Sequence, residues 1–277
     1  MNIKDAGRSV VKATAEKFGP FSDFLYRFCK AYVLAYKNFD YRFQSNGELH
    51  LLNALKKFPL KTIFDVGANK GEWALAALTR FPHAKIHSFE IVPATFSTLQ
   101  ENLTKYTQVQ LNPKGLSNTA AIVEIGFSPG HDGVSTIIHS EKIHDIPWQK
   151  VVGEVIRGDD YCRSNGIEHI DVLKIDVEGA EPLVIEGLSS MLNQSAVTVV
   201  QFEYGLANIY SRFLLKDYYE FFEKRGYIVG KLMPRGVWFK EYHPLDEDFI
   251  GPNYVAVLKS RLDVIDAIRD PHGPKRF

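Results

Sequence analysis

One stretch, residues 62–71, constrains the fold of this chain more than any other. It reads TIFDVGANKG: an apolar run rich in β-branched and aromatic residues meets an acid and then a turn of small residues. A helical pattern follows at once, which predicts a β-strand that turns sharply into a helix. Open α/β sheets bind ligands at the carboxyl ends of their strands, which is where this turn would lie.

The turn itself has the chemistry of a ligand-binding loop. Gly67 and Gly71 would let the backbone approach a ligand closely, and Asn69 is one of the few residue types that tolerate a positive φ angle. The pattern Gly-x-Gly-x-x-Gly is absent, which argues against a nicotinamide cofactor whose pyrophosphate rests on the helix N-terminus. An adenosine ligand without phosphates fits the loop. The alternative is that the loop is only a tight β–α turn.

From residue 62 onward, strand and helix patterns alternate. Strands are predicted at 62–66, 85–89 and about 107–111, with helices at about 70–80 and 94–104 between them. This alternation implies parallel strands joined by crossover helices, and so an α/β fold. Glu90 ends the second strand, where a right-handed crossover would bring its carboxylate to the two hydroxyls of an adenosine ribose. The alternative role for Glu90 is to cap the helix that follows Pro93.

A second informative stretch, residues 170–182, reads IDVLKIDVEGAEP. Its apolar part predicts a strand, with Asp176 and Glu178 at the carboxyl end. Lys174 and Asp176 are two positions apart and therefore share one face of that strand. A lysine in a central strand costs free energy unless it is paired, so we expect an ion pair with Asp176. The pair is either structural or part of a site, and its position at the ligand-binding edge favours a site.

The rest of the chain adds two further acid–base candidates. Residues 113–157 read as strands joined by a glycine-rich loop that carries His131. A loop histidine can accept a proton near a substrate, although solvent exposure is the alternative. A buried strand at 197–202 ends at Glu203, which would bring a carboxylate to the same edge of the sheet. The nine histidines show no zinc-binding spacing.

The N-terminal region carries an aromatic stripe at helical spacing. Its members are Phe21, Phe24, Leu25, Phe28, Tyr32, Ala35 and Tyr36. Arg27 and Lys30 interrupt any membrane span, so we predict an amphipathic helix whose stripe packs into the core. A substrate lid, a dimer contact and a membrane-surface helix are the alternatives. We predict a helical extension over 1–58, one catalytic domain over 59–260 and a polar tail over 261–277.

Composition excludes several classes of protein. The 33 basic and 33 acidic side chains cancel, so nothing in the overall charge indicates strong electrostatic attraction to nucleic acid or to an anionic membrane. The early residues lack the apolar core of a signal peptide, and we expect no transmembrane segment. Two cysteines, at positions without a metal or redox spacing, indicate a reducing compartment. We therefore expect a cytoplasmic protein.

Taken together, the motifs resemble the FkbM family of S-adenosylmethionine-dependent methyltransferases over about 46–259. The markers are FDVGANKG from Phe64 to Gly71, Phe89-Glu90, Gly115-Leu116-Ser117 and LKIDVEGAE from Leu173 to Glu181. The resemblance implies a Rossmann-like class I methyltransferase sheet of seven strands, mostly parallel with the last antiparallel. It also implies O-methylation of a small molecule or glycan, with S-adenosylmethionine as the cofactor.

The resemblance also implies roles for individual residues. It places the motif residues Asp65, Gly67, Ala68, Asn69 and Gly71 around the methionine end of the cofactor. Glu90 would bind the ribose, the chain around Ser117 would lie near adenine, and Asp176 would stand close to the cofactor amino group or the transferred methyl. One departure is Glu90-Ile91-Val92-Pro93, because proline more often follows the acid directly. The helix entry is therefore expected to differ, while the acid is retained.

The leading hypothesis is an O-methyltransferase acting on a hydroxyl of a sugar, glycan or small metabolite. Asp176, Glu178, Glu203 or His131 would act as the base, and Lys174 would orient Asp176 or steady an oxyanion. The alternatives are an N-methyltransferase, a non-catalytic cofactor-binding subunit and a nicotinamide oxidoreductase. We expect no metal, because Lys174 on the Asp176 face would repel a cation. A homo-oligomer is compatible with the sequence.

Overall fold

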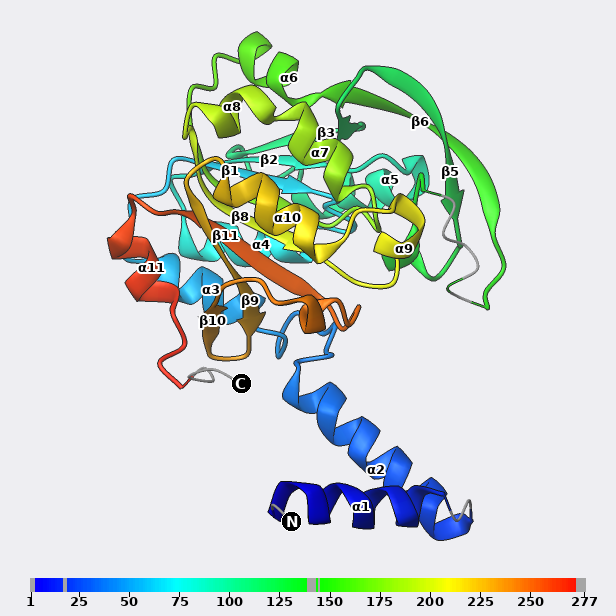
Figure 1. The fold of residues 1–277 in the computed structure, drawn as a ribbon. Helices are drawn as coiled ribbons and strands as arrows, with labels where there is room; N and C mark the ends of the chain where they lie inside the picture. Colours follow the sequence, from blue (N-terminus) through cyan, green and yellow to red (C-terminus); the bar gives the residue numbers. More distant parts are fainter. Residues whose placement is uncertain (1–2, 17–18, 139–142, 144, 273–277) are drawn as a thin grey trace. The chain divides into compact units, whose positions relative to one another are not determined.

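A computed structural model describes residues 3–16, 19–138, 143 and 145–272 of the chain (Figure 1). The chain divides into two compact units, residues 1–39 and residues 40–277. The smaller unit contains α1 (Ile3–Ala15) and α2 (Pro20–Tyr36). The Ser22 hydroxyl donates a 2.9 Å hydrogen bond to the carbonyl oxygen of Thr14, which links the two helices.

The aromatic stripe of α2 is exposed in the structure. Phe21, Phe24, Phe28 and Tyr32 each keep more than 60% of their surface accessible, and α2 contains no buried residue. The predicted helix is confirmed, but the expected core packing of its stripe is wrong. Helical spacing shows that one face is apolar and does not say what covers that face. None of the helices in the described part of the chain combines the length and the apolar character that a membrane crossing requires.

The larger unit is built on an eight-stranded sheet with the order β10-β9-β11-β8-β7-β1-β2-β3 (Figure 1). Its parallel strands are β1 (Thr62–Val66), β2 (Lys85–Phe89), β3 (Val109–Asn112), β7 (Ile170–Ile175) and β8 (Val197–Glu203). Strand β11 (Asn253–Leu258) lies between β8 and β9 (Tyr227–Met233) and is antiparallel to both. The Rossmann-like α/β prediction is confirmed. The described residues add one strand to the expected seven, β10 (Gly236–Phe239), which pairs with β9 at the sheet edge.

Helices cover both faces of this sheet. One face packs against α6 (Gly158–Ser164), α7 (Glu181–Gly187), α8 (Ser189–Asn193) and α10 (Leu215–Glu223). The other packs against α3 (Glu48–Leu55), α4 (Glu72–Arg80), α5 (Pro93–Leu103) and α11 (Leu262–Ile268). The alternation of Ile63 and Phe64 along β1 into opposite cores shows why central strands are apolar on both sides. A short helix, α9 (Asn208–Ser211), follows β8.

A separate three-stranded sheet covers the carboxyl end of the large sheet. It has the order β4-β6-β5 and consists of β4 (Gly115–Ser117), β5 (Ala121–Phe127) and β6 (Gln149–Arg157). Ile125 and Phe127 of β5 pack with Val92, which follows β2. The predicted strands of this region are therefore confirmed. They pack against the segment that follows β2, at the carboxyl end of the large sheet.

Two segments differ from the predicted domain boundaries. The smaller compact unit ends at Phe39, and α3 packs into the core of the larger unit. Residues 262–268 form α11, whose Val264, Ile265 and Ile268 are buried in that same core. A short helix with three apolar residues on one side reads as polar overall, although a single buried face suffices to dock it.

The loop after β1 holds the end of β7 at close range, and glycine is what permits this approach. Gly67 has a φ of +80°, and a Cβ built there would lie 1.8 Å from the carbonyl oxygen of Asp176. The Gly67 N–H donates to the Phe89 carbonyl at 3.0 Å, and the Asp176 N–H donates to the Val66 carbonyl at 3.0 Å. The three strand ends are thus bonded to one another around a position that has no room for a side chain.

We expect Gly67→Ala to lower the free energy of unfolding by about 3 kcal/mol or more, since backbone strain and a clash with backbone act together. Gly226→Ala is the matched control, because Gly226 has a φ of +81° with no atom within 4 Å of the added Cβ. Urea unfolding of both variants measures the difference. Equal losses in the two variants would show that the contact with Asp176 adds nothing to the φ strain.

Candidate active site

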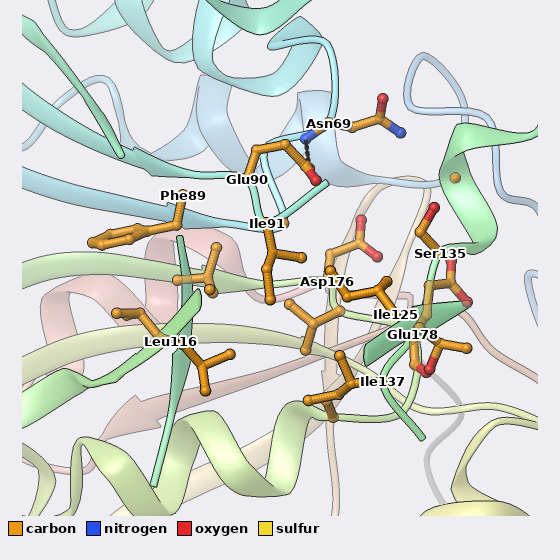
Figure 2. A pocket seen from close by; sticks show the side chains of 18 residues that line it. Asn69, Phe89, Glu90, Ile91, Leu116, Ile125, Ser135, Ile137, Asp176 and Glu178 are labelled. Carbon is orange, nitrogen blue, oxygen red and sulfur yellow. Dashed lines mark hydrogen bonds between the residues drawn. The ribbon is translucent and has the colours of Figure 1, made fainter. Parts of the chain in front are cut away.

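A cavity lies where the chain reverses direction across the large sheet, at the carboxyl ends of β1, β2 and β7 (Figure 2). From β1 the chain proceeds to β2 and β3 on one side, and it later places β7 and β8 on the other. Such a switch point leaves a crevice between diverging loops, which is where open α/β sheets bind ligands. The cavity is lined by Val66, Gly67, Asn69, Phe89, Glu90, Ile91, Gly115, Leu116, Ile125, Gly133, Ser135, Thr136, Ile137, Val155, Asp176, Val177, Glu178 and Ala180.

The loop after β1 adopts the left-handed conformations that its sequence predicts. Gly67, Asn69 and Gly71 have φ angles of +80°, +48° and +88°. This geometry turns the Asn69 N–H toward Glu90, whose Oε2 accepts it at 2.9 Å (Figure 2). The other carboxylate oxygen of Glu90 accepts the Val92 N–H at 2.8 Å. Glu90 is therefore fixed by two backbone donors from the two loops that border the cavity.

The environment of Glu90 sets its proton affinity. Burial raises the pKa of Glu90 to about 7, although the N–H donors of Val92 and Asn69 act in the opposite direction. The side chain lines the cavity and also bonds to the residue that precedes α5. The structure thus shows Glu90 as an anchor at the helix entry and places it in the cavity wall, while its binding to a ribose stays a prediction.

The end of the cavity away from Asp176 and Glu178 is apolar and includes Phe89 and Leu116 (Figure 2). The other large apolar lining residues are Ile91, Ile125, Ile137 and Val155, from the small sheet and the connecting loops. Ser117, which the resemblance placed near adenine, is buried and is not among the lining residues. Its neighbour Leu116 lines the cavity, because adjacent residues of a strand point to opposite faces.

The other end of the cavity is acidic. Asp176 and Glu178 line it, and Glu203 joins them at the end of β8. One carboxylate oxygen from each of these three acids lies within 4.8 Å of the other two. The parallel register causes this approach: Ile175 pairs with Phe202, so the residues that follow each of them emerge side by side. This is a spacing at which a cation or a shared proton could be held.

Lys174 lies beneath this acidic end and pairs with two strands at once. Its Nζ is 3.1 Å from Asp176 Oδ2 and 3.4 Å from Asp65 Oδ1, so the predicted pairing with Asp176 is confirmed. Burial disfavours the charged lysine, but Asp176, Asp65 and Glu48 outweigh it and raise the pKa of Lys174 above its ordinary value. Asp65 is completely buried and does not line the cavity. Within this structure it partners Lys174.

Glu178 and Glu203 hold protons more tightly than ordinary carboxylic acids. Burial is the largest cause of the raised pKa of both groups, and the charge of Asp176 raises both further. Glu178 has a φ of +54°, an uncommon conformation for a residue other than glycine. Two carboxyl groups of this kind beside Asp176 accept a proton more readily than ordinary carboxylates do.

Three other predicted residues lie outside the cavity lining. His131 is exposed in the loop after β5, where its Nδ1 is 3.5 Å from the Ser128 hydroxyl. Ala68 is buried and its N–H donates to the Phe89 carbonyl at 2.9 Å. Gly71 is the N-cap of α4, and a Cβ there would press on Leu99 and Leu103. Ala68 and Gly71 shape the turn that presents Gly67 and Asn69.

Two residues at the acidic end gave no signal in the sequence. The Thr136 hydroxyl donates to the Glu178 carbonyl at 2.8 Å and so ties the loop after β5 to the end of β7. Tyr41, from the segment before α3, lies near the same acids. Burial raises its pKa, and the charges of Glu203, Glu178 and Asp176 raise it further. Neither residue belongs to a recognisable motif, and both reach the site through tertiary packing.

The cavity fits S-adenosylmethionine by the chemistry of its walls. An apolar end suits a flat purine ring, and a carboxylate held at the end of β2 suits the two hydroxyl donors of a ribose. Asp176 suits the positive charge of the amino group or the sulfonium. All three chemistries are present in the lining of one cavity.

Comparison with known proteins is consistent with this geometry. The chain matches the family described as Methyltransferase FkbM domain over residues 65–229. It is 32% identical over 143 residues to Methyltransferase 1 of Beauveria bassiana, covering 46% of this chain and 57% of that protein. It is 30% identical over 157 residues to 2-O-methyltransferase NoeI of Sinorhizobium fredii, covering 52% of this chain and 64% of that protein.

A third relative is the hexuronic acid methyltransferase AglP of Haloferax volcanii, 27% identical over 146 residues, with 52% of this chain and 56% of that protein covered. The matches therefore span less than two thirds of the length of these relatives. The family match itself covers more than half of the present chain and includes the loop after β1, Glu90 and the acidic end of the cavity. The chain belongs to the FkbM family of methyltransferases.

Proposed function

We propose that this protein is an S-adenosylmethionine-dependent O-methyltransferase that acts on a hydroxyl of a sugar, glycan or small metabolite. The observation that carries the proposal is the convergence of Asp176, Glu178 and Glu203 at one end of a cavity whose other walls suit the cofactor. An alcohol is a poor nucleophile until its proton is removed, so a cluster of proton-accepting groups beside the methyl is what O-methylation requires. Two relatives, the 2-O-methyltransferase NoeI and the hexuronic acid methyltransferase AglP, support this class of acceptor.

When bound, S-adenosylmethionine supplies a methyl group activated by a positively charged sulfur. The chain's own residues bind and orient it. Glu90 would accept hydrogen bonds from the ribose hydroxyls, while the loop from Gly67 to Asn69 would approach the cofactor with its backbone. Asp176 places negative charge at the opposite end, where Lys174 holds it at 3.1 Å. Fixed positions of this kind matter because alignment supplies much of the acceleration in a transfer reaction.

Glu178 is the favoured base. It lines the cavity, whereas Glu203 lies beside it without being among the lining residues, and His131 is exposed outside the lining. The raised pKa of Glu178 makes it a stronger proton acceptor than an ordinary carboxylate, as a general base requires. Glu203, within 4.8 Å, would share the proton after transfer. Lys174 then acts as a positioning residue for Asp176.

Two other functions use the same cavity. An N-methyltransferase would need less help from a base, because the lone pair of a neutral amine attacks the methyl group without prior loss of a proton. A non-catalytic subunit would bind the cofactor and support a partner. The acid cluster favours the O-methyltransferase over both, since neither alternative needs carboxyl groups with raised proton affinity at the acceptor end.

The cofactor site is tested by Glu90→Ala. Loss of hydrogen bonds to a charged acceptor should weaken binding of S-adenosylhomocysteine by about 1.5–3 kcal/mol, measured by calorimetry. Glu101→Ala, an exposed acid on α5, is the control and should bind as the wild type does. Because Glu90 also anchors two loops, thermal unfolding must first show that the variant is folded. An unchanged affinity in a folded variant would reduce Glu90 to its role at the helix entry.

The same residue predicts a pH dependence. With a pKa of about 7 in the free protein, Glu90 loses its charge as the pH falls, and ribose hydroxyls bind the charged form better. Affinity for S-adenosylhomocysteine should therefore weaken progressively below pH 7. Glu90→Gln should bind weakly and lose this component of the pH dependence. A wild-type affinity that stays constant between pH 8 and pH 5.5 would contradict the assignment.

Methyl transfer is tested with isotopically labelled S-adenosylmethionine and a panel of glycans, hydroxylated metabolites and amines. We expect label in hydroxyl acceptors, with turnover that rises with pH as Glu178 loses its proton. Glu178→Gln should lower turnover by about 10²–10⁴-fold while cofactor affinity is retained. Glu168→Gln, an exposed acid before β7, is the control. Protein that binds cofactor yet labels no acceptor, cell extract included, would favour the non-catalytic subunit.

We propose that the transfer needs no metal, because the Lys174 ammonium already pairs with one of the three clustered acids and would repel a cation. The three acids are close enough together to bind a metal ion, so chelation can contradict the proposal. Activity should survive exhaustive chelation with EDTA. Loss of turnover that magnesium or manganese specifically restores would overturn the proposal and assign Asp176, Glu178 and Glu203 as ligands.

A further inference from the structure

The N-terminal unit presents an apolar surface that the methyltransferase chemistry does not use. We define the apolar arc of α2 as Phe21, Phe24, Leu25, Phe28 and Tyr32. Positions separated by three and four residues share one side of a helix, so these five side chains form a continuous stripe. Their exposed fractions run from 38% for Leu25 to 67% for Phe21. The rings of Phe24 and Phe28 are stacked with centroids 6.4 Å apart.

Charged residues of α2 lie on the other side of the helix. Asp23, Arg27 and Lys30 follow one another at spacings of four and three, and all three are exposed. Helix α1 repeats the pattern: Val10 and Val11 are 67% and 68% exposed, and Lys12 lies in the last turn. Both helices of this unit are therefore amphipathic, and each has exposed apolar side chains.

Charge divides the chain at the same boundary as the fold. Residues 1–39 carry seven basic and three acidic side chains, a net charge of +4. Residues 40–277 carry 26 basic and 30 acidic side chains, a net charge of −4. The neutral total of the whole chain hides this separation. The unit that exposes the aromatic stripe is thus also the unit that would be attracted to a negatively charged surface.

We propose that residues 1–39 dock the protein on the surface of an anionic lipid bilayer. In this arrangement the apolar arc of α2 enters the boundary between headgroups and acyl chains, and the basic side chains remain at the headgroup level. Phenylalanine supplies apolar area there, and tyrosine suits the boundary because one end of its ring is apolar and the other polar. Basic residues near the surface add electrostatic attraction to anionic lipids.

The charge pattern favours a bilayer over a second copy of the chain as the occupant of this surface. Two copies that joined through their α2 helices would bring two units of net charge +4 together, and the mutual repulsion opposes such a dimer. An anionic bilayer instead matches both the apolar and the electrostatic properties of the unit. The methyltransferase cavity belongs entirely to residues 66–180, so docking leaves its lining residues in place.

The test uses the purified full chain and sedimentation with vesicles of phosphatidylcholine alone or mixed with phosphatidylglycerol. Binding should require the anionic lipid and should fall as salt is raised, because exposed charges are screened. Phe24→Ser/Phe28→Ser should lower the partition constant by at least about tenfold, which corresponds to 1.4 kcal/mol. Arg27→Gln/Lys30→Gln should lower binding to the anionic vesicles and reduce the salt dependence.

Tyr26→Ser/Val33→Ser is the matched control. It removes two exposed apolar side chains, 66% and 44% accessible, from the same helix but outside the apolar arc, and binding should stay within about twofold of the wild type. Equal binding to neutral and anionic vesicles would overturn the proposal, as would an equal loss in the control. Light scattering provides a further check: a wild-type dimer that Phe24→Ser/Phe28→Ser dissociates, without vesicle binding, would assign the arc to a second copy of the chain.

Discussion

The ion pairs of Lys174 hold together the part of the molecule on which the rest depends. A buried ammonium must be compensated, and Lys174 is compensated from two strands, by Asp65 of β1 and by Asp176 after β7. The chain adds β2 and β3 on one side of β1 and later adds β7 and β8 on its other side, so the strand order reverses between β1 and β7. A pair of this kind contributes little net stability, because desolvation offsets the attraction, but its loss leaves uncompensated charge in the core. Its main consequence is therefore geometric, because it fixes the carboxyl end of β1 next to that of β7.

The same pairing explains the chemistry of the acidic end. Lys174 pairs with Asp65 and Asp176, and Glu178 and Glu203 lie beside Asp176 in a half-buried setting. The raised pKa of Glu178 and Glu203 follows from this surplus of acids, since burial and like charge both favour the protonated form. One cation thus serves a site that contains more acids than it can pair with.

The small sheet forms part of the cavity wall. Its strands bring Leu116, Ile125 and Val155 to the cavity lining, and the loop after β5 reaches the acidic end through the bond from Thr136 to the Glu178 carbonyl. The cavity therefore arises from the meeting of two sheets. The strand ends of the large sheet supply the charged groups, and the small sheet contributes three of the apolar lining residues.

The N-terminal unit shows the opposite relation between sequence and environment. Its helices form where periodicity predicts them, yet their apolar sides remain exposed. In the larger unit, equally apolar stripes on α4 and α10 are buried against the sheet. A periodic apolar pattern therefore predicts which side chains share a face of a helix. Whether that face meets protein, lipid or water depends on what lies opposite.

Local sequence determined much of this protein. It specified the strand-turn-helix at 62–80, the positive φ of Asn69, the place of Glu90 at the end of β2 and the pairing of Lys174 with Asp176, because each depends on residues close in the chain. The tertiary structure alone decided that Asp65 is buried and outside the cavity lining, how closely Glu203 meets Glu178 at the sheet edge predicted for both, and that Tyr41 and Thr136 reach the acidic end. Those contacts join segments far apart in sequence. They depend on the register of β7 against β8 and on the paths of long loops, neither of which leaves a periodic signal in the residues themselves.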